Sequence, residues 1–156
     1  MYVAAVVYVF TSNAELKTAV NLWFSNNELA LETYGHISTW RTGNVTDMAE
    51  LFCADDVYNH CTHYHSAASS FNEDISGWET ESVTSMERMF MYAGAVSQPI
   101  GGWNTSKVES MKEMFESATS FSEPLDGWET GAVLDMRYMY HGTTVVFFGV
   151  WYIIML

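Results

Sequence analysis

The residues best suited to chemistry lie in one short segment, CADDVYNHCTHYH, at 53–65. It holds both cysteines of the chain, Cys53 and Cys61, and three of its five histidines. Two cysteines this close in sequence predict a disulfide that closes a small loop if the chain meets an oxidising compartment. On an extended segment, Cys61, His63 and His65 would share one side, and these residue types bind transition metals. A disulfide and a metal site are both open interpretations of this segment.

Elsewhere the sequence offers modification sites rather than catalytic motifs. Asn44 and Asn104 begin the sequons NVT and NTS, so they are candidates for glycosylation in a secreted protein. There is no Gly-rich phosphate loop and no G-x-S-x-G motif, and no carboxylate pair stands out. We therefore expect no catalytic residue, no cofactor and no enzymatic activity.

The charge balance excludes some partners. The formal net charge is −13, from 19 acidic residues against 6 Lys and Arg, and such a surface repels phosphate backbones. We expect no nucleic-acid binding. The apolar run at 145–156 is shorter than the roughly 20 residues of a membrane span, but it would seek a protein or membrane partner. The apolar run at 2–10 has no preceding basic residue and no clear cleavage site, so we expect no complete signal peptide there.

A repeat organises most of the chain. Trp78, Trp103 and Trp128 lie 25 residues apart, and Trp40 marks an earlier copy that an insertion separates from the second. Agreement of many positions at one period indicates an array of structural units that pack like residue on like. The other positions expected to form such ladders are Met86, Met111 and Met136, and Phe90, Phe115 and Tyr140.

Within a copy two rhythms alternate. Val83, Met86 and Phe90 belong to an apolar series with helical spacing, and Thr84 has the position of a helix N-cap. The segment 74–80 is short and flanked by turn residues, which favours a strand. The sequence thus predicts an α/β solenoid of about four 25-residue coils, each with one strand and one short helix.

The ends of the array carry different sequences. The segment 12–24 has helical apolar spacing and a capping-box pair, so it predicts a helix that caps the N-terminal end. The expected organisation is an N-terminal apolar segment and capping helix over 1–32, a repeat region over 33–143, and an apolar tail over 144–156. The copies fall near 33–55, 71–95, 96–120 and 121–143, with the insertion loop at 53–65.

The phrase FNEDISGWETESVTSMERMF, with its echoes GGWNTSKVESMKEMF and DGWETGAVLDMRYMY, resembles the BspA-like surface-protein repeat. That family was first grouped through mycoplasma lipoproteins and is related to leucine-rich repeats. The similarity covers about 33–143, with departures such as Val96 in place of the leading Phe. The resemblance implies a leucine-rich-repeat-like α/β solenoid, a cell-surface or extracellular location, and a role in adhesion or protein binding. It carries no catalytic residue.

Two functions are expected from the sequence, the first from the resemblance and the second from the residues of the insertion. The first is a non-catalytic repeat scaffold that binds a protein or a glycan at a cell surface or after secretion. The alternative is a metal-binding protein that uses the Cys- and His-rich insertion at 53–65.

Overall fold

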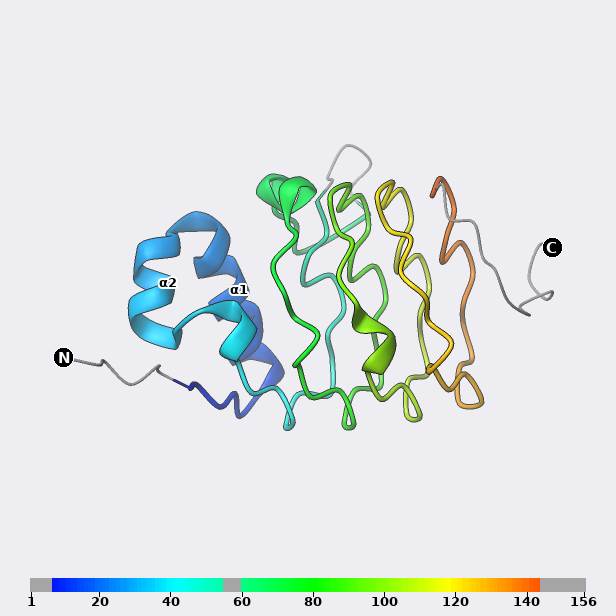
Figure 1. Ribbon diagram of the computed structural model, residues 1–156, viewed down its shortest axis with the longest axis horizontal. Helices are drawn as coiled ribbons and strands as arrows, with labels where there is room; N and C mark the ends of the chain where they lie inside the picture. The colour runs from blue at the N-terminus through cyan, green and yellow to red at the C-terminus, as the bar shows by residue number, and fades with distance from the viewer. Residues whose placement is uncertain (1–6, 55–59, 144–156) are drawn as a thin grey trace.

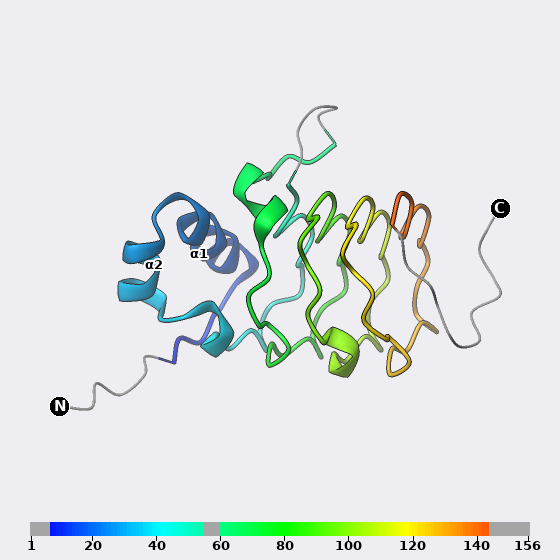
Figure 2. The ribbon, with the colours of Figure 1, turned by 45° about the horizontal axis from the view of Figure 1, so that its top comes forward.

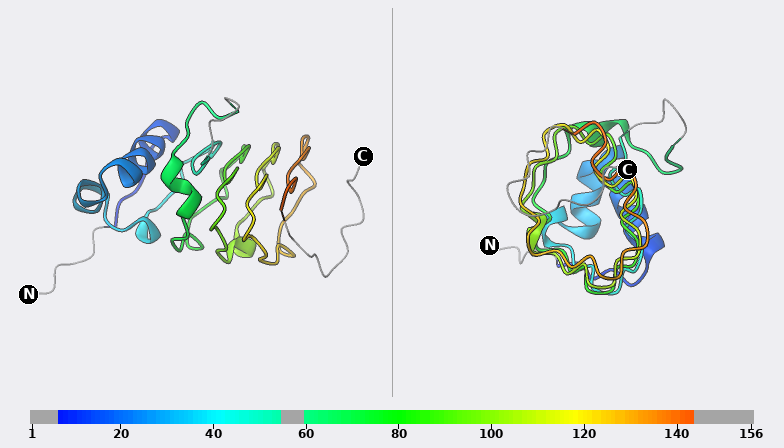
Figure 3. Two further views of the ribbon diagram at one scale, coloured as in Figure 1. Left: turned by 90° about the horizontal axis from the view of Figure 1, so that it is seen from above. Right: turned by 90° about the vertical axis from the view of Figure 1, so that its right-hand side faces the viewer.

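The computed structural model describes residues 7–54 and 60–143. Two helices form the N-terminal end: α1 at Asn13–Ser25 and α2 at Asn27–Tyr34. Three short 3₁₀ helices follow, η1 at Ile37–Thr39, η2 at Ser66–Ser70 and η3 at Ile100–Gly102. The repeat copies then lie side by side in chain order along the long axis (Figure 1), and they superimpose when the molecule is viewed from its end (Figure 3).

Helix α1 occupies the segment that the sequence predicts to be helical. The Ser12 hydroxyl accepts a hydrogen bond from the Glu15 N–H at 3.2 Å, as an N-cap does. The buried face consists of Leu16, Ala19, Val20 and Trp23. Glycine ends α2, because Gly35 takes φ 74°, a value that side-chain-bearing residues rarely adopt.

The predicted α/β fold class is wrong. The described residues contain no strand beyond isolated bridges, and the only α-helices among them are α1 and α2. The stacked copies therefore contain neither the strand nor the short helix that the repeat was expected to form. The β-bridges between described copies are single and parallel: Asp47↔Ser85, Ser85↔Ser110 and Ser110↔Asp135.

Left-handed backbone explains why no helix forms in the repeat. Arg88, Glu113 and Tyr138 occupy the same repeat position, and their φ angles are 53°, 56° and 57°. A right-handed helix cannot continue through such residues. The backbone N–H groups turn instead to the next copy: Arg88 donates to the Lys112 carbonyl and Glu113 to the Arg137 carbonyl, both at 2.9 Å. The apolar spacing that resembles a helix is also produced by these successive turns.

Aromatic side chains form the columns inside the stack. The rings of Phe52, Phe90, Phe115 and Tyr140 stack in sequence, with centroids 5.4–5.6 Å apart. Met86 and Met111 are fully buried, whereas Met136 in the last copy is partly exposed.

The tryptophans tie each copy to the one before it. Trp78 donates its indole N–H to the Ile37 carbonyl at 3.0 Å, Trp103 donates to Ile75 at 3.2 Å, and Trp128 donates to Ile100 at 3.0 Å. Trp40 donates to Gly35 at 3.1 Å. The tryptophan positions therefore contribute both apolar burial and a directed hydrogen bond.

Buried threonines make the corresponding link in the forward direction. The hydroxyls of Thr42, Thr80 and Thr105 donate to carbonyl oxygens of the following copy at 2.9–3.0 Å. Among the described residues, no buried side-chain nitrogen or oxygen lacks a hydrogen-bond partner. The buried threonine hydroxyls thus form hydrogen bonds between copies.

Helix α1 closes the exposed edge of the first copy. The Asn13 amide oxygen accepts from the N–H groups of Thr46 and Asp47 at 2.8 and 3.2 Å. At the equivalent place in the second and third copies, a backbone carbonyl accepts two N–H groups: Thr84 O binds the N–H groups of Glu109 and Ser110. The first copy has no copy before it, and the Asn13 side chain supplies the acceptor that such a copy would provide. These two N–H groups are therefore not left unpaired at the edge of the stack.

Several expectations concern residues outside the described part. The apolar tail at 144–156 and residues 1–6 lie outside it. Of the N-terminal apolar run, Val9 bridges to Arg41 and Phe10 is buried against the first copy. Within 7–54 and 60–143, no helix has the length and apolar character needed to cross a membrane.

Candidate functional site

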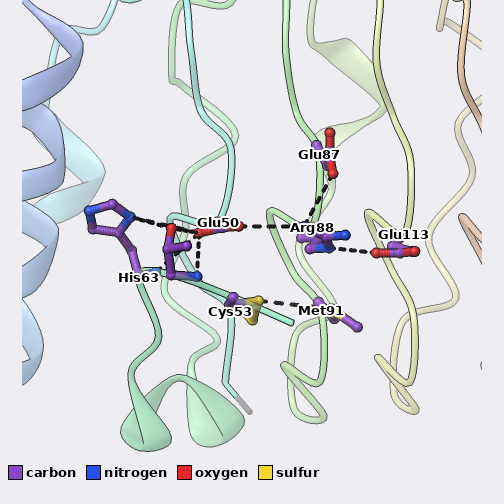
Figure 4. Close-up of a disulfide and its surroundings, with 9 residues drawn as sticks. Glu50, Cys53, His63, Glu87, Arg88, Met91 and Glu113 are labelled. Carbon is purple, nitrogen blue, oxygen red and sulfur yellow. Dashed lines mark hydrogen bonds and ion pairs between the residues drawn. A yellow bond between two sulfur atoms is a disulfide. The ribbon is translucent and has the colours of Figure 1, made fainter. Parts of the chain in front are cut away.

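The disulfide-anchored insertion leaves the stack directly after Phe52. Cys53 and Cys61 are joined by a disulfide, with their Cα atoms 6.5 Å apart. Both are buried, and the Cys61 sulfur lies 3.8 Å from the Met91 sulfur (Figure 4). Cys53 occupies the repeat position of Met91, so the disulfide takes a place in the stack that methionine takes in the next copy. The insertion is therefore fixed to the stack at its base.

The Glu50 carboxylate holds the segment of the insertion that returns to the stack. Its Oε2 accepts from the Thr62 hydroxyl at 2.7 Å, the Thr62 N–H at 2.9 Å and the His63 N–H at 3.1 Å. Its Oε1 lies 3.7 Å from Nη1 of Arg88. Burial opposes ionisation of Glu50, but the hydrogen bonds from Thr62 and His63 and the charge of Arg88 outweigh it. The pKa of Glu50 therefore lies below its ordinary value.

Arg88 connects this carboxylate to the next copies. Its Nε donates to Glu113 Oε2 at 2.5 Å, and its Nη1 lies 3.3 Å from Glu87 (Figure 4). Lys112 lies 3.4 Å from Glu113 and 3.7 Å from Glu87. Burial lowers the pKa of Arg88, but the three carboxylates raise it by more, so it lies above its ordinary value. An alternating row of charges thus runs across the second and third copies.

The two histidines of the insertion make different contacts. The His63 ring is exposed, and its Nδ1 lies 3.7 Å from Glu50. The His65 ring stacks on Phe24 of α1 at 4.9 Å, and the His65 N–H donates to the Cys53 carbonyl at 2.8 Å. Burial, and then the neighbouring His63, lower the pKa of His65. His65 therefore serves as a contact between the insertion and the N-terminal helices.

The structure does not assemble the proposed metal ligands. The Cys61 sulfur is in the disulfide, so it is not a thiolate, and the His65 ring packs on Phe24. In the described part of the chain, no three His, Cys, Asp or Glu side chains come together in a way that could hold a metal ion. A thiolate-based site at Cys61 would first require reduction of the disulfide.

The candidate glycosylation sites are both exposed. Asn44 donates its amide N–H to the Phe10 carbonyl at 3.3 Å. Asn104 accepts from the N–H and the hydroxyl of Ser106 at 3.1 and 2.7 Å, which closes a tight turn at that sequon. Neither side chain belongs to the insertion.

The clamp formed by Glu50 and Arg88 is absent from the sequence-based candidates. A signal for it exists, because Glu50, Arg88 and Glu113 occupy one repeat position and alternate in charge. Once copies are known to stack in register, alternating charges at one position predict a row of ion pairs. The partners that lie outside the repeat, Thr62 and His63, have no such signal.

Comparison with known proteins relates most of the chain to a protein family. Neither the curated proteins nor the solved structures include a match to this chain. A family model described as "Mycoplasma protein of unknown function, DUF285" matches residues 18–147, which include α2, the insertion and all the repeat copies. This match spans most of the chain, and we conclude that the protein belongs to the DUF285 family of Mycoplasma proteins of unknown function.

Proposed function

We propose that this chain is a non-catalytic scaffold that binds a protein or a glycan at a cell surface or after secretion, as a BspA-like surface protein. The observation that carries the proposal is the register of the stack. Thr80 and Thr105 tie each copy to the next beside the turns at 79–82, 104–107 and 129–132. Exposed side chains of these turns therefore line up on one surface, which we name the turn face.

The chemistry of the turn face suits recognition of an extended partner. Glu81, Asn104, Lys107 and Glu129 are exposed on it. Repeat proteins use such aligned surfaces for binding, because each copy adds one further row of side chains. Inside the stack, by contrast, polar side chains bind other copies, as the threonine and tryptophan contacts illustrate.

The disulfide supports the proposed location. Disulfides form and persist in oxidising environments and are rare where glutathione and thioredoxin keep thiols reduced. Mass spectrometry of the protein isolated from producing cells, with alkylation before lysis, tests this. We expect a chain lighter by two hydrogen atoms with unmodified cysteines. Full alkylation of Cys53 and Cys61 would contradict export to an oxidising compartment.

Binding arrays test the scaffold itself. We expect the disulfide-bonded chain to bind saturably to a member of an array of purified extracellular proteins and glycans, and to leave that partner unchanged in mass. The double variant Glu81→Lys/Glu129→Lys reverses two charges on the turn face, and it should weaken binding at least tenfold. The matched control Glu28→Lys/Glu32→Lys reverses two charges on α2, in the helical end of the molecule, and should bind as the parent does. Silent arrays, or equal losses in both variants, would contradict the proposal.

A further inference from the structure

Residues at the end of α1 and in or just after η2 line a groove. Figure 2 shows these two elements where the helical end meets the stack. The volume of the groove is about 230 Å³. Three aromatic residues, Trp23, Phe24 and Phe71, line it together with the polar residues Ser70, Asn72 and Glu73. None of these residues belongs to the turn face or to the Glu50 clamp.

The aromatic wall is fixed before any ligand arrives. Phe71 stacks on Phe52 at 4.2 Å and meets Phe24 edge-on at 5.9 Å. Trp23 packs edge-on against Trp40 at 6.0 Å. His65 stacks on one face of the Phe24 ring at 4.9 Å, but Phe24 lines the groove and is only partly buried. A ligand that stacks on this wall would pay little to order it.

The polar rim is fixed except at its carboxylate. The Asn72 oxygen accepts from the Ser97 N–H and from the Gln98 amide at 2.9 and 2.8 Å. The Glu73 side chain is 47% exposed, and among the described residues its only basic neighbour within 4.0 Å is His36, at 3.6 Å. Glu73 thus has room to bind an external cation.

Few basic side chains of the chain are free to pair with Glu73. Five of the six Lys and Arg side chains already form ion pairs within the chain, namely Lys17, Arg41, Arg88, Lys112 and Arg137. The formal net charge is −13. The surrounding field therefore attracts a cationic ligand and disfavours an anionic one.

We propose that this groove receives an arginine side chain of a partner protein, with the guanidinium against Phe24 and hydrogen-bonded to the Glu73 carboxylate. Arginine fits better than lysine, because its planar guanidinium stacks on aromatic rings and binds a carboxylate through two parallel N–H groups. This inference rests on the proposed function, since it names a protein as the partner and arginine as its anchor.

A titration with short capped peptides tests the assignment. The probes are Gly-Arg-Gly, Gly-Lys-Gly and Gly-citrulline-Gly, and the readout is the amide and Trp indole N–H signals in ¹H–¹⁵N spectra of the full chain. We expect the arginine peptide to shift the Trp23 indole signal saturably, the lysine peptide to bind at least threefold more weakly, and the uncharged citrulline peptide to cause no saturable shift. Equal binding of citrulline, or of tetramethylammonium, would overturn the assignment to arginine.

Two matched variants locate the charge. Glu73→Gln should weaken binding of the arginine peptide at least tenfold. Glu123→Gln changes the carboxylate at the same repeat position two copies later, outside the groove, and should leave binding unchanged. Spectra that overlay away from the substituted residue show that both variants fold. Equal affinities of the two variants would overturn the site.

The binding array and the peptide titration test the two proposals separately. A chain that binds an array partner but not the arginine peptide would retain the scaffold function and overturn the groove. A chain that binds the peptide at Glu73 with silent arrays would retain the groove and overturn the scaffold.

Discussion

The repeat copies and the helical end formed by α1 and α2 are held by different kinds of contact. Between copies, the same backbone hydrogen bonds recur, and the side-chain contacts repeat position by position. At the helical end, individual side chains do the work: Asn13 accepts two backbone N–H groups, and Lys17 pairs with Asp47 at 3.1 Å. Contacts of the first kind follow a period in the sequence, whereas those of the second kind depend on single residues.

The largest expected effect comes from opening the aromatic column. Phe90 is fully buried and stacks between Phe52 and Phe115. Phe90→Ala should lower the free energy of unfolding by about 4 kcal/mol, because it leaves a cavity that the neighbouring copies cannot fill. Chemical denaturation measures this. Phe24 is only half-buried and lies in the helical end, so Phe24→Ala should lower the free energy of unfolding by less than half as much. Equal losses in the two variants would contradict the contrast between the two regions.

Removal of the disulfide should have the next largest effect. Cys53→Ser/Cys61→Ser frees a loop that closes between residues eight apart, which should cost about 2–3 kcal/mol. Thermal unfolding of the oxidised parent and the variant gives the difference. Reduction of the parent should reproduce the loss in the variant. A reduced parent as stable as the oxidised one would show that the insertion contributes nothing to the stack.

The copies differ in the space around one shared glycine position. Gly77, Gly102 and Gly127 share a repeat position, but a Cβ at Gly127 would lie 2.6 Å from the Gly101 carbonyl oxygen, whereas at Gly77 and Gly102 nothing lies within 4 Å. Gly127→Ala should therefore cost about 2 kcal/mol of unfolding free energy. Gly77→Ala is the matched control and should change it by less than about 0.5 kcal/mol. Similar values for both would mean that the close approach at Gly127 relaxes freely.

Asn13 allows a direct test of the helical end. Asn13→Ala removes the acceptor of the Thr46 and Asp47 N–H groups, and it should cost about 1–2 kcal/mol. Hydrogen exchange should accelerate at the amides of Thr46 and Asp47 but not at those of Glu109 and Ser110, which bind a backbone carbonyl. Uniform acceleration in both places would indicate global unfolding instead of an opened edge.

The smallest expected effect depends on pH. Glu50→Gln should cost about 1 kcal/mol at pH 7, since it removes the charge that strengthens the hydrogen bonds from Thr62 and His63. The pKa of Glu50 is lowered in the folded chain, so its contribution is present above its ordinary value of 4.5 and is lost as the pH falls through the folded value. Unfolding curves of parent and variant should converge in acid. A constant difference down to pH 2 would contradict the role of the charge.

The sequence predicts the positions of the repeat better than its backbone. The rings of Phe90 and Phe115, and those of Trp103 and Trp128, stack on one another at the 25-residue spacing. The predicted helix near Thr84 is wrong because the apolar spacing there suits a run of turns equally well. In addition, the residue type of a left-handed position such as Arg88 does not reveal its backbone conformation. Glycine or asparagine would have signalled such a turn, but Arg, Glu and Tyr do not.

The insertion was predictable only at its cysteines. Cys53 and Cys61 are the only cysteines of the chain, and the structure joins them. Their pairing removes the Cys61 thiolate on which the metal hypothesis depended. The contact of His65 with Phe24 joins segments about forty residues apart and follows no period, so nothing in the local sequence announces it.

Backbone and Trp contacts within the stack join immediate neighbours, and this gives the molecule a modular length. A 25-residue unit inserted in register between 95 and 96 would receive a Trp indole bond from the copy after it and donate one to the copy before it, as its neighbours do. Each added unit would lengthen the stack by about 4.8 Å, the spacing of paired backbone segments. Recombination between repeats of one gene could therefore lengthen or shorten the protein without altering its helical end.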